Sequence, residues 1–145
     1  MADKLPENLQ EIVDTFREVT PRDRLDLLLE FAESMPDLAP ELAAMRDSME
    51  QVHECQSPVF LRTRLEEGRI FYDLDVPREA PTVRGFASIL YEGLNGTTPE
   101  AIESVPLDLY EQLGLNEVLS SQRVRGMTAL LSYMKRSAQR VAQAA

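Results

Sequence analysis

Residues 59–76 read VFLRTRLEEGRIFYDLDV, and this stretch decides the class of fold. Apolar side chains alternate with charged ones on both sides of Glu66-Glu67-Gly68, which is the period of strands with one buried and one solvated face. Gly68 supplies a residue that tolerates a positive φ in a tight turn. The pattern therefore predicts an antiparallel hairpin. Its buried face is expected to contain Val59, Leu61, Thr63, Leu65, Ile70, Tyr72, Leu74 and Val76.

Helical periodicity surrounds the hairpin on both sides. Apolar residues recur every three or four positions, and Thr20-Pro21 and Thr98-Pro99 each provide a capping side chain followed by a proline at the first helical position. The pattern leaves residues 48–53 open between a helix end and a weak strand. Helices are expected at residues 7–19, 21–35, 40–45 and 83–94, from Thr98, at 106–113 and over 127–141.

The order of these elements predicts the fold class. Helices, then a small meander, then helices form an α+β fold with the helices on one face of the antiparallel sheet. Gly85 stands inside one expected helix, where glycine costs about 1 kcal/mol relative to alanine, so we expect a neighbouring element to pack closely against it. No repeat, linker or low-complexity segment interrupts the chain, and residues 1–145 are expected to form one domain.

The composition excludes several classes of protein. A chain of 145 residues that is 43% hydrophobic and 28% charged is ordinary for a soluble globular domain. A net charge of -10 disfavours nucleic acid and anionic membranes as partners. No apolar run approaches the roughly 20 residues of a membrane span, and the N-terminus lacks the order of a secretory signal. One cysteine forms no internal disulfide, so a cytoplasmic location is expected.

The only cysteine, Cys55, lies in the sequence HECQSPVF at residues 53–60, where helical spacing gives way to strand spacing. Gln56, Ser57 and Pro58 favour a short connection that feeds the strand. A loop held by a rigid scaffold can present a side chain to a partner. From composition alone, however, a small buried side chain is the simpler interpretation of Cys55.

Three other kinds of site have weaker support. A structural zinc site usually takes four cysteine and histidine ligands, and this chain has only His53 and Cys55. An extended backbone places these two side chains on one face but beyond hydrogen-bond reach, which disfavours a nucleophile–base pair. Asp73 and Asp75 would lie about 7 Å apart along a strand, as in some glycosidases, but alternating charges on a solvated face explain them more simply.

The segment Cys55-Gln56-Ser57, followed by Pro58-Val59-Phe60, resembles the acceptor loop of the SufE family, in which a Gly-Cys-Gln-Ser-x-Val-aromatic segment opens a strand. Glu54 stands where the family usually has the glycine. Other similar segments follow in the family's order along essentially the whole chain. They are residues 35–38, 83–85, 95–102, 113–115 and 119–127.

This resemblance implies a SufE/NifU-like fold and a sulfur-acceptor function. A cysteine desulfurase would transfer persulfide sulfur to Cys55, and the acceptor would stimulate the desulfurase and pass the sulfur on to iron–sulfur cluster assembly. Gln56, Ser57, Arg123 and Glu79 would serve the loop or the contact with the partner. Glu79 stands roughly where the family has an acidic residue at a helix entry.

The resemblance also implies the partners and the cofactor of the reaction. A SufS-like cysteine desulfurase is the expected partner, and iron–sulfur scaffold proteins are further candidates. The desulfurase carries pyridoxal phosphate, and no cofactor or metal is expected on this chain, which would be an accessory sulfur-transfer protein rather than a stand-alone enzyme. Two alternatives stay open: an interaction module of the same fold that carries no sulfur, and a redox-sensing thiol protein.

Overall fold

The sheet is a three-stranded antiparallel meander in the order β1–β2–β3. The computed structural model describes residues 5–53 and 58–144, and its strands are β1 (Glu50–Val52), β2 (Val59–Glu66) and β3 (Arg69–Asp75). Glu67 and Gly68 join β2 to β3 with φ values of 52° and 78°, the left-handed conformation that a two-residue hairpin requires. The predicted hairpin is confirmed. Residues 48–53, which the pattern left open, end a 3₁₀ turn and form the short strand β1.

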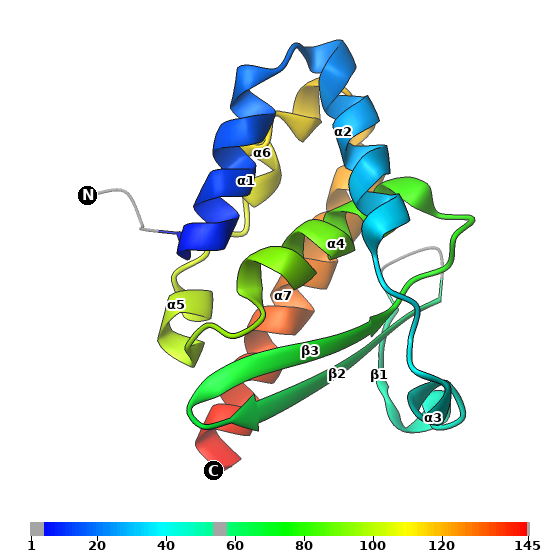
Figure 1. Ribbon diagram of the computed structural model, residues 1–145, viewed down its shortest axis with the longest axis vertical. Coiled ribbons are helices and arrows are strands. Elements are labelled where there is room, and N and C mark those ends of the chain that lie inside the picture. Colours follow the sequence, from blue (N-terminus) through cyan, green and yellow to red (C-terminus); the bar gives the residue numbers. More distant parts are fainter. Residues whose placement is uncertain (1–4, 54–57, 145) are drawn as a thin grey trace.

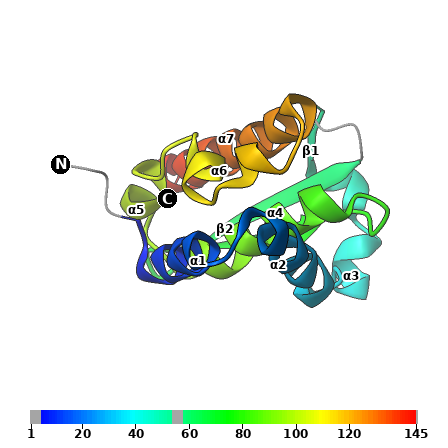
Figure 2. The same ribbon diagram turned by 90° about the horizontal axis from the view of Figure 1, so that it is seen from above.

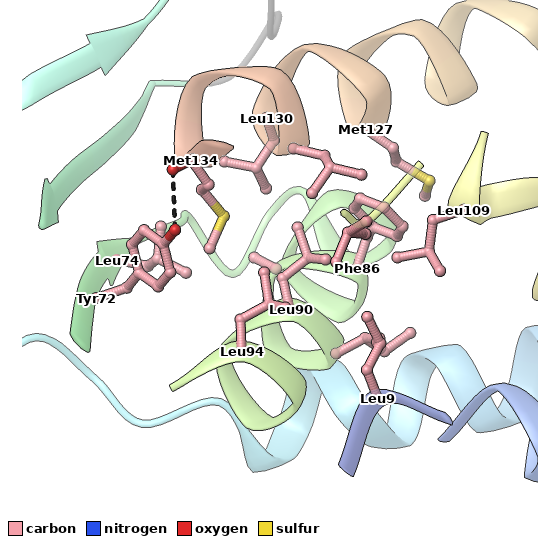
Figure 3. Close-up of a cluster of buried hydrophobic side chains, with 14 of the residues drawn as sticks. Leu9, Tyr72, Leu74, Phe86, Leu90, Leu94, Leu109, Met127, Leu130 and Met134 are labelled. Atoms are coloured by element: carbon pink, nitrogen blue, oxygen red, sulfur yellow. Dashed lines mark hydrogen bonds between the residues drawn. The ribbon is translucent and has the colours of Figure 1, made fainter. Parts of the chain in front are cut away.

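One face of the sheet is buried under two helices, α4 (Pro81–Leu94) and α7 (Ser121–Ala144). Tyr72 lies in this interface, where its hydroxyl donates a hydrogen bond of 2.8 Å to the carbonyl of Met134 on α7 (Figure 3). Burial raises the pKa of Tyr72 well above its usual range, so the hydroxyl stays a donor at physiological pH. Every apolar residue of the predicted inner face is buried except Leu65, which packs against the core half-buried.

The opposite face of the sheet carries charged side chains. Arg64 pairs with Asp73 at 3.2 Å, and Arg46 pairs with Asp75 at 2.5 Å. Each of the two aspartates is therefore neutralised by an arginine, as expected for a solvated face. The guanidinium of Arg46 also lies 5.8 Å from the ring centroid of Phe60, which adds a cation–π contact at this face.

Helix α4 lies at the centre of the fold, with α1 (Glu7–Glu18) and α2 (Pro21–Ser34) on one side and α7 on the other (Figures 1 and 2). A Cβ atom on Gly85 of α4 would lie 2.4 Å from the backbone oxygen of Leu28 in α2. The close approach expected at this glycine is confirmed. The predicted cap of α2 is also present, because the backbone N–H of Asp23 donates to the side chain of Thr20 at 3.3 Å.

The remaining helices of the described chain are short. They are the α-helices α3 (Pro40–Ala43), α5 (Pro99–Glu103) and α6 (Leu109–Gln112) and the 3₁₀ helices η1 (Arg46–Ser48) and η2 (Leu115–Glu117). The prediction of a helix over residues 106–113 was too long. The backbone N–H of Leu109 closes a turn on the carbonyl of Pro106 at 3.1 Å, and α6 begins only after it. Gly114 then adopts a φ of 72° and ends the segment, as expected for a helix stop.

The buried side chains of the helices and the sheet form one contiguous cluster, part of which Figure 3 shows. Leu9 of α1, Phe86 and Leu90 of α4, and Leu130 of α7 meet there at complete or nearly complete burial. The α+β class predicted from the sequence is therefore confirmed. Among the residues that the structure describes, no helix is long and apolar enough to cross a membrane.

Candidate functional site

The candidate site is the end of the sheet where β1 ends and β2 begins. Val52 pairs with Val59 across these two strands, so the chain ends that flank the cysteine-bearing connection are held side by side. Phe60 pairs with Asp75 at the end of β3, which brings the turn after β3 to the same end of the sheet. Glu79 lies in this turn and is exposed.

The first turns of α4 and α7 meet near this end. The guanidinium of Arg123, in the first turn of α7, donates a hydrogen bond of 2.8 Å to the hydroxyl of Thr82, in the first turn of α4. The side chain of Ser120 accepts from the backbone N–H of Arg123 at 3.3 Å, a capping contact that starts α7 here. Two helix N-termini, each with a partial positive charge, and one arginine therefore lie next to one another.

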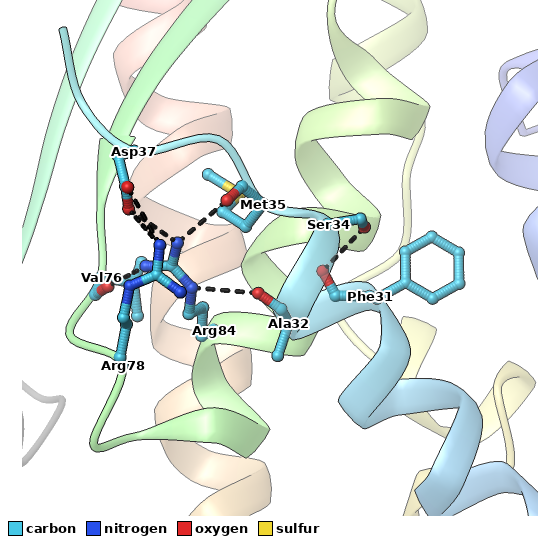
Figure 4. A network of polar contacts seen from close by, with 8 residues as sticks. All are labelled: Phe31, Ala32, Ser34, Met35, Asp37, Val76, Arg78 and Arg84. Carbon is cyan, nitrogen blue, oxygen red and sulfur yellow. Dashed lines mark hydrogen bonds and ion pairs between the residues drawn. The ribbon is translucent and has the colours of Figure 1, made fainter.

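Buried Arg84 connects the turn after β3 to the end of α2 (Figure 4). Its side chain, 6% exposed, donates to the backbone oxygens of Ala32 at 3.0 Å, Met35 at 2.9 Å and Val76 at 2.5 Å. Ala32 lies in the last turn of α2 and Met35 follows it, where carbonyls lack intrahelical partners and a cation is favoured. Arg84 thus ties the end of α2 to the start of the turn after β3.

Asp37 links this buried arginine to the surface. Its carboxylate accepts two hydrogen bonds of 2.9 Å from Arg78 and lies 3.3 Å from the Arg84 guanidinium. The hydrogen bond from Arg78 and the Arg78 charge, followed by the Arg84 contacts, hold the pKa of Asp37 below its usual value of 3.8. Because Arg78 precedes Glu79 by one residue, this pair restrains the turn that carries Glu79.

The predicted site residues divide into two groups. Cys55, Gln56 and Ser57 lie outside the described residues, and the roles predicted for them stay predictions. Arg123 and Glu79 both lie at the described end of the sheet, but no hydrogen bond or ion pair joins these two side chains. Their roles also stay predictions.

Sequence reasoning missed two residues at this end of the sheet, Thr82 and Arg84. Thr82 is buried and anchors Arg123, but a threonine at a helix start carries no distinctive pattern. Arg84 left a clearer signal, because a charged residue stands between Val83 and Gly85 in an otherwise apolar helix. A buried arginine needs several acceptors, so its position predicts a polar contact inside the fold.

The fold defines a class of protein: a small α+β protein with a three-stranded antiparallel meander, in which the cysteine lies in sequence between the paired strands β1 and β2. Residues 10–138 match the model of the SufE family, described as an Fe-S metabolism associated domain. The chain belongs to the SufE family.

Individual relatives agree with this assignment. An uncharacterized SufE-like protein of Mycobacterium tuberculosis is 47% identical over 133 residues, which cover 91% of this chain and 92% of that protein. The sulfur acceptor protein CsdE of Escherichia coli is 30% identical over 120 residues, covering 81% of this chain and 78% of CsdE. The solution structure of a hypothetical protein from Thermus thermophilus is 34% identical and superposes with a TM-score of 0.83 over 97% of this chain and 99% of that one.

Proposed function

We propose that this protein accepts sulfur on Cys55 from the persulfide of a cysteine desulfurase, stimulates that desulfurase, and passes the sulfur on to iron–sulfur cluster assembly. Membership of a family associated with Fe–S metabolism, with a named sulfur acceptor among the relatives, supports a sulfur-acceptor role. The observation that carries the residue assignment is that the chain has a single cysteine. Any thiol chemistry of this protein must therefore use Cys55.

The transfer is a thiol–disulfide exchange in form. The Cys55 thiolate attacks the outer sulfur of the partner's persulfide, a new S–S bond forms on Cys55, and the partner's S–S bond breaks. The partner cysteine leaves as a thiolate, and the proton of the outer sulfur moves with that sulfur. No external oxidant or reductant is needed, because the sulfur changes carrier without a net change in oxidation state.

The described end of the sheet supplies an environment that suits a thiolate. Helix N-termini and nearby cations stabilise sulfur anions, and the first turns of α4 and α7 meet here through Arg123 and Thr82. This local positive character stands in a protein with a net charge of -10. We assign Arg123 the role of favouring the Cys55 thiolate or contacting the partner, and Gln56 and Ser57 the role of shaping the loop.

The remaining parts of the proposal follow from this chemistry. Pyridoxal phosphate, which releases sulfur from free cysteine, belongs to the desulfurase, and this chain needs no cofactor of its own. Iron–sulfur scaffold proteins are the proposed recipients of the sulfur. A reducing, cytoplasmic setting suits a working thiol that has no internal disulfide partner.

The decisive experiment mixes the protein with a cysteine desulfurase and cysteine. Intact-mass spectrometry should show one added sulfur atom on the native protein, and desulfurase turnover should rise. Cys55→Ser should abolish both effects. If Cys55→Ser still stimulates the desulfurase, the protein is an interaction module that carries no sulfur. If Cys55 is oxidised to sulfenic acid or forms a glutathione adduct without any desulfurase, the protein is a redox sensor.

The role of Arg123 is tested by the rate at which iodoacetamide alkylates Cys55 at neutral pH. Removing one nearby exposed cation with Arg123→Met should slow alkylation about threefold, because less of the thiol is ionised. Arg125→Met is the matched control, since Arg125 is exposed on the same helix. Equal rates for the two variants would remove Arg123 from the proposed site.

A further inference from the structure

A groove lies between the C-terminal half of α7 and the connection from α5 to α6, far along α7 from Arg123. It has a volume of about 490 Å³. We call it the basic groove. Its lining carries three cations, Lys135, Arg136 and Arg140, and two carboxylates, Glu50 and Glu103, together with Leu107 and Tyr133.

Helix α7 has an unusual charge for this chain. It carries five basic residues and no aspartate or glutamate over 24 residues, whereas the whole protein has a net charge of -10. Three of those five basic residues line the basic groove. Of the two carboxylates that also line the groove, Glu50 and Glu103, Glu50 is paired with Arg140. The three cations still outnumber them, and an excess of positive charge on a molecule of negative net charge can select a partner electrostatically.

The three cations of the groove differ in what they already bind. Lys135 donates to the carbonyl of Val105 at 2.5 Å, and Arg140 pairs with Glu50 at 2.6 Å. Arg136 is exposed, and within residues 5–53 and 58–144 it makes no ion pair. Its guanidinium lies 4.6 Å from the ring centroid of Tyr133, a contact that orients the group while its N–H donors remain available.

An exposed apolar side chain, Leu107, lines the same groove. Leu107 is 44% exposed, and it is one of two large hydrophobic residues classed as exposed in the described part of the chain. Two side chains of α7 hold the segment that precedes Leu107. Lys135 donates to the carbonyl of Val105, and Gln139 donates to the carbonyl of Pro99 at 3.2 Å. The groove is therefore a fixed surface with one apolar position and one available cation.

We propose that the basic groove docks an acidic segment of a partner protein, with a carboxylate on Arg136 and an apolar side chain on Leu107. A small inorganic anion fits less well, because two of the three cations are already paired and only one guanidinium remains. A second copy of this chain also fits less well. The acidic helices α1 and α2 of one copy would contact α7 of the next. Such a head-to-tail contact uses two different surfaces, so it does not form a closed dimer.

The basic groove is separate from the sulfur-acceptor end of the sheet. Arg136 follows Arg123 by 13 residues on the same helix, which is about 20 Å at 1.5 Å per residue. A partner on the groove would leave the other end of α7 accessible. The docking proposal therefore does not depend on the proposed function, and a sulfur-free Cys55→Ser protein should dock the partner equally well.

The test uses a synthetic peptide, Glu-Asp-Glu-Leu-Phe-Glu-Asp-Glu with both ends blocked, titrated into the isotope-labelled full chain and followed by amide NMR shifts. The shifts should cluster at Leu107, Tyr133 and Arg136 and should weaken as salt rises. A peptide with lysine in place of each acidic residue should give none. Arg136→Glu should weaken binding about tenfold, and Leu107→Ser about threefold.

Arg125→Glu is the matched control, because it reverses an exposed charge of the same helix outside the groove. It should change the affinity less than twofold. The proposal is overturned if Arg125→Glu and Arg136→Glu weaken binding equally, if pyrophosphate produces the same shifts at the same concentration, or if no shifts occur. It is also overturned if sedimentation shows a concentration-dependent oligomer that Arg136→Glu abolishes, since the occupant is then a second copy.

Discussion

Replacing Arg84 by methionine should destabilise the protein much more than the same change at Arg78. Methionine keeps most of the apolar stem but removes all donors, so the backbone oxygens of Ala32, Met35 and Val76 lose their partner. Each buried acceptor left without a partner costs about 1–3 kcal/mol. At the low end of that range, Arg84→Met should lower the free energy of unfolding by about 3 kcal/mol.

Arg78→Met removes a guanidinium that also contacts Asp37, but its side chain is 65% exposed. An exposed ion pair contributes less than about 1 kcal/mol. The two variants should therefore differ by about 2 kcal/mol in urea denaturation followed by circular dichroism. At about 3–4 °C per kcal/mol for a chain of this size, Arg84→Met should lower the Tm by about 10 °C and Arg78→Met by no more than about 3 °C. Equal losses for the two variants would refute the idea that Arg84 acts through buried backbone acceptors.

Two further predictions concern the neighbouring contacts. Gly85→Ala places a Cβ atom 2.4 Å from the backbone oxygen of Leu28. Because α2 and α4 must then move apart, the free energy of unfolding should fall by about 2 kcal/mol even after the gain from alanine's higher helix propensity. An unchanged urea midpoint would contradict the close approach. The pKa of Asp37 is lowered in the folded protein, mainly by Arg78, so its stabilising effect should be complete above about pH 5 and be lost as the pH falls below 3.8. Urea titrations across this range should show the native protein converging with Asp37→Asn at acid pH, and two parallel curves would exclude this linkage.

Local rules were sufficient to predict most of the fold. Alternation over residues 59–76 predicted β2 and β3 with the correct buried face, and Thr20 and Thr98 cap the helices that they were expected to start. Gly85 predicted a close approach, and the approaching element is α2. These features depend on a few neighbouring residues, which a sequence pattern can record directly.

The parts that the sequence left open depend on pairing between distant segments. β1 is three residues long and owes its conformation to its register with β2, so the periodicity of residues 48–53 alone was ambiguous. The contact between Arg123 and Thr82 joins residues 41 positions apart. No local spacing indicates such a contact, and the family resemblance pointed to Arg123 without its anchor.

The way this end of the sheet is built would suit the partner contact proposed for it. Apolar packing buries Val76 at the start of the turn after β3, but the exposed residues Arg78 and Glu79 that follow it have no such cover. Arg84 also holds the carbonyl of Val76 through a hydrogen bond, and Arg123 donates a hydrogen bond to Thr82. Hydrogen bonds to backbone and hydroxyl groups fix position while leaving the outer surface exposed, which is why Glu79 is accessible in a turn whose start is rigidly anchored. Hydrogen bonds from arginine here add to the apolar burial of Val76, and the positive charge of Arg123 is the part of this arrangement that the proposed thiolate would use.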